Sequence, residues 1–152
     1  MMELKGEREI AVCRSKVWEG LNNPEVLLKS IPGCQEFYGS VEEGYAIKVT
    51  QKIGPVKATF KGRVDLEDII PEKSYTLRGE AKAGAAGMGS GEAKVKLSDT
   101  DKGTLLVYLV DAKVGGKIAQ LGSRLIGGVA KKLADKFFTK FQEVVEGKNS
   151  HQ

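Results

Sequence analysis

The chain is poor in the side chains that most hydrolytic and metal-dependent catalysis requires. Its 152 residues include one histidine, His151, which lies in a polar stretch beside the last residue. Without a second histidine, Ser–His and Cys–His relays cannot be built. The two cysteines, Cys13 and Cys34, have no Cys or His partners at metal-ligand spacing. The sequence therefore predicts neither a nucleophilic triad nor a metal site, and it indicates a protein that is not an enzyme.

Long hydrophobic runs are also missing. No window reaches the roughly 18 uninterrupted apolar residues that indicate a transmembrane helix. The first seven residues are too polar for a secretory signal. Because nothing indicates export, we expect Cys13 and Cys34 to be reduced, packed thiols rather than a disulfide. These features predict a cytoplasmic protein, which could also lie peripherally at the inner face of the membrane.

Charge of one sign is only mildly in excess, with a formal net charge of +4. The lysines lack the stripe and the interleaved aromatics of a nucleic-acid surface, so we expect no nucleic-acid partner. Positive charge gathers only on the predicted last helix. We interpret it as a solvated helix face, with contact to an anionic membrane or an acidic partner as the alternative. The residues concerned are Lys117, Arg124, Lys131, Lys132, Lys136 and Lys140.

What the chain does have is clear strand alternation. Apolar and polar residues alternate over 45–53 and 56–66, and the pattern recurs in the neighbouring segments. Six consecutive strands with short turns, together with a first strand at 4–12, predict an antiparallel sheet of seven strands. Two short helices after the first strand, at 16–21 and from Pro24 to about Ser30, are best interpreted as a lid or plug at one edge of the sheet.

One long amphipathic helix follows the last strand, at about 117–146, with apolar residues at every third or fourth position. It is the only predicted element long enough to cover the apolar face of the sheet. The sequence therefore predicts an α+β fold in which a curved antiparallel sheet grips a C-terminal helix. We expect a single ligand-binding domain at 1–147 and a flexible tail at 148–152.

The hairpin at 79–93 carries almost no side-chain bulk on one face. Because side chains alternate across a strand, small residues from both arms should lie together. They are Gly79, Ala81, Ala83, Gly89, Gly91 and Ala93. A long helix over such a thinned sheet predicts an internal cavity with apolar walls and few polar anchors. Alternatively, glycines on the helix let the two backbones approach closely and leave no cavity.

We expect ligand contacts from the inward-facing residues of the strands and the helix, with Tyr45, Gln51 and Tyr108 as the polar anchors. The predicted set is Tyr45, Ile47, Val49, Gln51, Phe60, Leu77, Gly79, Ala81, Gly91, Ala93, Leu106, Tyr108, Val110, Leu121, Leu125 and Val129. Glu80 and Glu92 could form a carboxylate pair for acid–base chemistry. Alternation places both on the polar face, so we interpret them as members of solvated cross-strand salt bridges.

Several segments resemble the carbon monoxide dehydrogenase G-subunit family of the START-like superfamily, over 4–145. The most specific are Val17–Pro24, Ile31–Cys34, Ile53–Gly62, Ala85–Gly87 and Asp111–Ile126. The resemblance implies a helix-grip fold with an internal cavity suited to a quinone or similar lipid, and no covalently bound cofactor. It also implies an accessory role beside a molybdenum-containing carbon monoxide dehydrogenase or a related hydroxylase, including its contact with the membrane. A cyclase- or aromatase-like enzyme, and an assembly factor that acts through its surface, remain alternatives.

Overall fold

The computed structural model describes residues 2–147, and within them it contains seven strands, three α-helices and two 3₁₀ turns. In chain order these are β1 (Met2–Ile10), α1 (Arg14–Leu21), α2 (Pro24–Ser30), β2 (Cys34–Ser40), β3 (Gly44–Ile53), β4 (Val56–Ile70), β5 (Ser74–Lys82), η1 (Gly84–Ala86), β6 (Met88–Thr100), β7 (Gly103–Gly115), η2 (Lys117–Leu121) and α3 (Ser123–Glu146). The predicted fold class is confirmed. The predicted tail at 148–152 lies outside the described residues.

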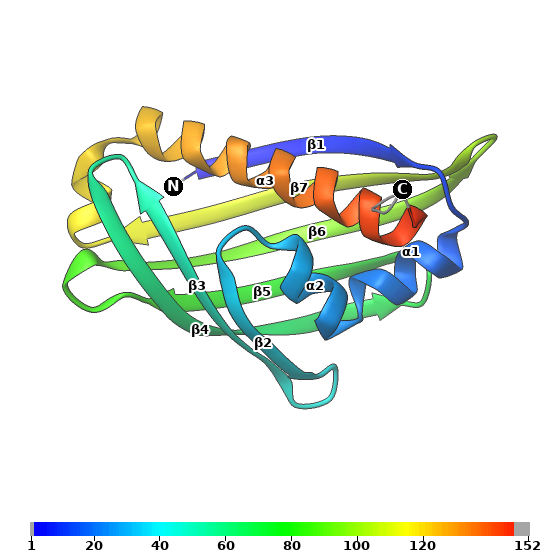
Figure 1. Ribbon diagram of the computed structural model, residues 1–152, viewed down its shortest axis with the longest axis horizontal. Coiled ribbons are helices and arrows are strands. Elements are labelled where there is room, and N and C mark those ends of the chain that lie inside the picture. Colours follow the sequence, from blue (N-terminus) through cyan, green and yellow to red (C-terminus); the bar gives the residue numbers. More distant parts are fainter. Residues whose placement is uncertain (1, 148–152) are drawn as a thin grey trace.

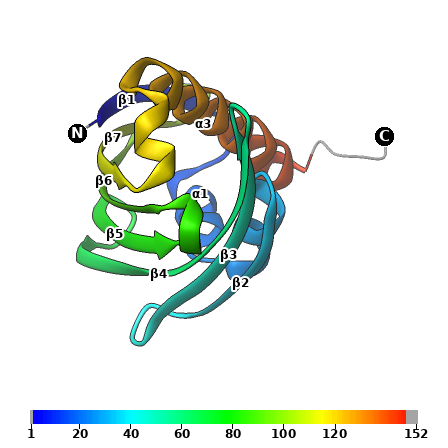
Figure 2. The ribbon, with the colours of Figure 1, turned by 90° about the vertical axis from the view of Figure 1, so that its left-hand side faces the viewer.

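All seven strands form one antiparallel sheet in the order β1-β7-β6-β5-β4-β3-β2. Strands β2 to β7 follow one another through hairpins, whereas β1 pairs with β7 along its whole length. The sheet curls without closing, and α3 lies across the gap between β1 and β3 (Figures 1 and 2). Hydrogen bonds from Arg8 to Gln142 (3.2 Å) and from Gln142 to the Glu9 carbonyl (3.1 Å) hold the helix to the edge of β1. The helix thus covers an edge that would otherwise stay unpaired.

The packed core lies at one end of the molecule, between α1 and the C-terminal half of α3 (Figure 1). Ile10, Val17, Leu106 and Phe141 are completely buried there. Apolar burial of this kind stabilises each side chain by about 1.5–3 kcal/mol. Along β3, the inner-face residues from Ile47 onwards are only half buried. The packed core is therefore concentrated at one end of the fold.

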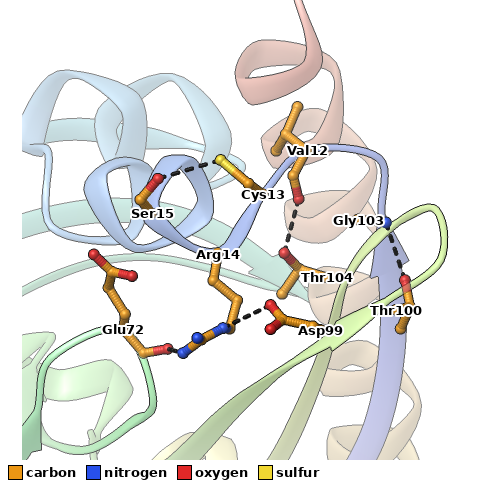
Figure 3. Close-up of polar contacts among 9 residues, drawn as sticks. All are labelled: Val12, Cys13, Arg14, Ser15, Glu72, Asp99, Thr100, Gly103 and Thr104. Carbon is orange, nitrogen blue, oxygen red and sulfur yellow. Dashed lines mark hydrogen bonds and ion pairs between the residues drawn. The ribbon is translucent and has the colours of Figure 1, made fainter.

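Polar contacts fasten α1 to the strand ends that surround the core (Figure 3). Arg14 donates to the carboxylate of Asp99 at 2.7 Å and to the carbonyl of Glu72 at 2.9 Å. The buried Thr104 hydroxyl donates to the carbonyl of Val12 at 2.7 Å. These bonds satisfy polar groups next to the core, where an unpaired group would cost free energy.

Two local predictions differ from the structure. The last helix does not run unbroken from 117, because Gly122 adopts φ +96° and separates the 3₁₀ turn η2 from α3. A left-handed φ cannot continue a right-handed helix, and glycine adopts it without a steric penalty. The first helix begins at Arg14 and has Cys13 rather than Ser15 as its N-cap. Consequently Cys13 is exposed and not packed as expected, and both Cys13 and Cys34 are free thiols.

Candidate functional site: an apolar cavity under the long helix

An apolar cavity of about 310 Å³ lies between the inner face of the sheet, α2 and the second half of α3. It begins where the packed core ends, because several residues, Tyr75 and Leu106 among them, belong to both. Its walls are formed by Leu21, Leu27, Ile31, Phe37, Tyr45, Ile47, Val64, Leu66, Tyr75, Leu77, Ala93, Val95, Leu106, Tyr108, Val110, Ala134, Phe137 and Phe138. Among these lining residues, the only polar side-chain groups are the hydroxyls of three tyrosines.

A second space of about 350 Å³ continues from this cavity over the small residues of β5 and β6, and it opens to the surface. The two spaces share five wall residues, so they are parts of one interior. The shared residues are Ile47, Val64, Leu77, Ala93 and Val110. Figure 2 looks along the molecule from this open end, with α1 at the far end of the curled sheet. A ligand larger than the cavity alone could extend towards the opening.

The register of the hairpin explains the missing bulk. Gly79 pairs with Gly91 and Ala81 pairs with Gly89, so small side chains face the interior from both strands. A Cβ added at Gly79 or Gly89 would meet only atoms of the neighbouring strands within 4 Å, and none of α3. On the helix, a Cβ added at Gly128 would meet nothing within 4 Å. These distances contradict the alternative in which small residues let the helix pack closely on the sheet.

Two of the lining tyrosines are almost fully enclosed. Tyr45 on β3 is 3% exposed and Tyr75 on β5 is 4% exposed. Burial raises the pKa of both phenols above the usual value, and the neighbouring Tyr45 raises the pKa of Tyr75 further. Both side chains therefore stay protonated at neutral pH. Within residues 2–147, neither hydroxyl forms a hydrogen bond with another residue.

Tyr108 contributes its ring rather than its hydroxyl to the cavity. The ring stacks on Phe138 with centroids 4.9 Å apart. The hydroxyl lies over Gly6 of β1, where a Cβ would come within 2.6 Å of it. Burial raises the pKa of Tyr108, and the charge of Asp135 adds to that effect. This tyrosine thus closes the cavity on the side of β1.

Comparison with known proteins agrees with this architecture. The sequence profile of the carbon monoxide dehydrogenase G-subunit (CoxG) family matches residues 6–146, which is nearly the whole chain. The chain belongs to the CoxG family. Among curated proteins, none matches the chain.

Several solved structures share the fold of this CoxG-family chain. A conserved protein from Geobacillus kaustophilus is 32% identical with a TM-score of 0.89, and the match covers 99% of both chains. A protein from Mesorhizobium loti (15% identity, TM-score 0.70) matches 98% of this chain and 100% of its own. A protein from Thermus thermophilus (14% identity, TM-score 0.71) gives the same coverages. The last two likenesses concern the fold alone.

Most of the predicted ligand contacts of this CoxG-family chain lie along the interior. Those on its walls are Tyr45, Ile47, Leu77, Gly79, Ala81, Gly91, Ala93, Leu106, Tyr108 and Val110. The remaining predicted residues lie outside both spaces. They are Val49, Gln51, Phe60, Leu121, Leu125 and Val129.

Specific contacts explain these exceptions. The side-chain amide of Gln51 donates to the carbonyl of Pro32, so it holds the loop between α2 and β2 instead of facing the cavity. Leu125 is 37% exposed and packs against the turn at Gly54, between β3 and β4. Val49 and Phe60 are paired with each other across β3 and β4. The start of α3 thus packs against the turn between β3 and β4, away from the centre of the sheet.

Several wall residues were missed from the sequence. Leu21, Leu27 and Ile31 come from the short helices and the loop after them, which we interpreted only as a lid. The spacing of these apolar residues was the signal in the sequence that could have identified them as wall residues. Tyr75 shares its alternation with Leu77, so its inward orientation was readable from the strand pattern.

The described acidic and metal-ligating side chains of this CoxG-family chain lie in ion pairs or apart from one another. Among residues 2–147, no three His, Cys, Asp or Glu side chains are placed to hold a metal ion. Glu92 forms an ion pair with Arg78 (3.6 Å), as the predicted cross-strand salt bridge requires, and Glu80 pairs in register with Arg63. In the described part of the chain, no helix is both long enough and apolar enough to span a bilayer.

Proposed function

We propose that this CoxG-family protein is a non-enzymatic carrier that shelters an apolar, quinone-like or lipid ligand. The carrier would serve a molybdenum carbon monoxide dehydrogenase-type oxidoreductase. One observation carries the proposal: a cavity of about 310 Å³ with purely apolar walls apart from tyrosine hydroxyls, continuing into an open space of about 350 Å³. Small-molecule sites usually have volumes of roughly 300–1,000 Å³ and apolar linings. The walls of the 310 Å³ cavity suit a fused ring or an alkyl chain, and apart from the tyrosine hydroxyls they carry no ionisable side chain.

The open end supports a contact with the membrane from which such a ligand would come. Three segments meet there, at 50–61, 81–90 and 112–128, and they contain no aspartate or glutamate. They carry seven exposed cations: Lys52, Lys57, Lys61, Lys82, Lys113, Lys117 and Arg124. Met88, which is 52% exposed, adds apolar surface between them. Cations with exposed apolar side chains are typical of surfaces that bind anionic lipids.

The predicted basic face of the last helix is therefore divided in two. Lys117 and Arg124 belong to the open end, whereas Lys131, Lys132, Lys136 and Lys140 run along α3. Lys140 is 3.8 Å from Glu143, which weakens its attraction for an anionic surface. We propose that the open end, rather than the length of the helix, faces the membrane.

The test is uptake of 2-methyl-1,4-naphthoquinone, with a cavity-filling variant and a matched control. Ala93→Leu adds three carbons at a wall residue shared by both spaces, and we expect it to lower affinity at least about tenfold. Lys94→Leu places a leucine on the exposed outer face of the same strand and should leave affinity unchanged. Isothermal titration calorimetry and native mass spectrometry measure both. Equal affinity in the two variants, or no uptake by the unaltered protein, would contradict the carrier role.

A further inference from the structure

We propose that Tyr45 and Tyr75 form a pair of hydrogen-bond donors inside the cavity that binds a neutral apolar molecule through a carbonyl oxygen. The inference rests on the proposed carrier function and specifies the chemistry of its ligand. The proposal assigns a role to Tyr75, which was not among the ligand contacts predicted from the sequence. It also pairs Tyr45, which was among them, with a second hydrogen-bond donor. The ligand class is a ketone, quinone or ester on an otherwise hydrophobic body.

The first support is that both tyrosines are almost fully buried while their hydroxyls have no hydrogen-bond partner among the described residues. Tyr45 and Tyr75 are 3% and 4% exposed, and both line the cavity. Neither donates to or accepts from another residue within 2–147. No completely enclosed side-chain oxygen in this part of the chain lacks a partner, so each of the two hydroxyl oxygens keeps some accessible surface. A hydroxyl that no protein group engages is free to donate its hydrogen bond to a ligand in the cavity.

The second support is that both rings are held in place by their neighbours. Tyr75 packs edge-on against Trp18 of α1, with ring centroids 5.4 Å apart. Tyr45 packs against Phe37 of β2, with centroids 5.1 Å apart. The two tyrosines come from strands separated only by β4, and both line the same cavity. A pair fixed in this way loses little side-chain freedom when a ligand binds.

The third support is the absence of charge from the cavity walls. No Lys, Arg, His, Asp or Glu is among the described residues that line the 310 Å³ cavity where both tyrosines lie, and the charged residues of the interior line only the open space. A carboxylate or phosphate would have to lose its hydration without gaining a counter-ion, so such a ligand group is disfavoured. Because the phenols stay protonated, each can donate to an acceptor that carries no charge. A carbonyl oxygen, with two lone pairs, can accept from both.

The test compares two probes with related ring skeletons, 2-methyl-1,4-naphthoquinone and 2-methylnaphthalene, which lacks both carbonyls. We expect the unaltered protein to bind the quinone about tenfold more tightly than the hydrocarbon. Tyr45→Phe and Tyr75→Phe should each weaken quinone binding by about threefold, and the double variant should lose about tenfold and so remove the preference between the probes. Phenylalanine keeps the ring, so hydrocarbon affinity should stay within about twofold of the original.

A matched control and a second measurement separate this role from a general loss of packing. Tyr38→Phe removes a hydroxyl from the same sheet at a position that is 60% exposed and outside the cavity, and it should change neither affinity. Infrared spectroscopy of the bound quinone should show a carbonyl stretch lowered by hydrogen bonding, which returns towards the unbonded frequency in the double variant. Equal affinity of the unaltered protein for both probes would overturn the donor pair but not the carrier function. Binding of neither probe would overturn both.

Discussion

Cys13 lies exposed at the N-cap of α1, with its Sγ 3.2 Å from the hydroxyl oxygen of Ser15 (Figure 3). The hydrogen bond from Ser15 favours the thiolate and lowers the pKa of Cys13 below its ordinary value, and the backbone amide of Lys16 acts in the same direction. Cys34 has the opposite surroundings, because partial burial raises the pKa of its thiol. The two thiols of one small protein should therefore differ in reactivity.

This difference predicts the pH dependence of alkylation. Iodoacetamide should modify Cys13 with a midpoint at lower pH than Cys34, because only the thiolate reacts. Ser15→Ala should move the midpoint of Cys13 to higher pH, whereas Ser40→Ala, a serine remote from either thiol, should not. Peptide mass spectrometry of the trapped protein resolves the two sites. A midpoint for Cys13 at or above that of Cys34 would contradict the assignment.

Single residues were the least predictable level of this molecule. Alternation gave the direction of Tyr45 and Tyr75 but could not tell that their hydroxyls would remain unpaired. Gln51 alternates with the same face, yet its amide bonds to Pro32, a residue 19 positions earlier in the chain. Such a contact depends on where a loop returns in space, and no local pattern encodes that.

Among the elements, the junction between η2 and α3 depends on one glycine. Gly122 has φ +96° and lies in open space, where a Cβ would meet no atom within 4 Å. Gly128 lies in equally open space but inside regular helix. Comparing the two positions therefore shows how backbone conformation alone affects stability, because an added side chain would meet no neighbour at either one.

We expect opposite results from the same substitution at these two positions. Gly122→Ala should lower the free energy of unfolding by about 1–3 kcal/mol, because a side chain strains the left-handed backbone. Gly128→Ala should raise it by up to about 1 kcal/mol, because alanine favours helix over glycine. Urea denaturation followed by circular dichroism measures both. Equal stability changes of the same sign would mean that the break at Gly122 is absent in solution.

At the level of elements the sequence was informative, because each strand is bounded by turn residues and alternates clearly. The pairing of Leu77 with Ala93 and of Gly79 with Gly91 follows from a single hairpin. The helix boundary was missed because Gly122 resembles any tolerated helix glycine in the sequence. Only its positive φ distinguishes it, and that φ cannot be read from the local sequence.

Across the whole molecule, charge is divided between the two ends. The open end has the three segments without carboxylates, while the packed end carries Asp99, Asp101, Glu72 and other acids in its turns. Electrostatic attraction should therefore orient the molecule at an anionic surface with its open end foremost. The total charge of +4 gives no indication of this division.

Two double variants of equal charge test this orientation. Lys82→Glu with Lys113→Glu alters the open end, and Lys73→Glu with Lys102→Glu alters the packed end. Each basic residue near an anionic membrane contributes about 1 kcal/mol, so the first variant should bind vesicles containing phosphatidylglycerol at least about tenfold more weakly. The second should bind nearly as well as the unaltered protein, and added salt should weaken all three. Co-sedimentation measures the difference; equal losses would refute a preferred orientation.

The overall architecture was predictable because seven strands and one long helix leave few ways to bury the apolar face of a sheet. The existence of an interior space followed from the run of small residues around Gly79 and Gly91. The depth of this space could not be predicted, because its walls include side chains from α1, α2 and β2 that only the folded chain brings together. The solid core beside it was equally hidden from local patterns.

A helix rather than an eighth strand completes the wall of the cavity, and its attachment is one-sided. The hydrogen bonds that join α3 to β1 and to Ala11 just after it involve Thr139, Gln142 and Glu146, in the last turns of the helix. Within the described residues, 123–134 form no hydrogen bond with the sheet. The first half of α3 is therefore held to the sheet by apolar contacts alone, such as that of Leu125 with the turn at Gly54. Separating that half from the sheet would break apolar contacts but none of the hydrogen bonds between the strands, so it should be the part of the helix that opens at the lowest free energy.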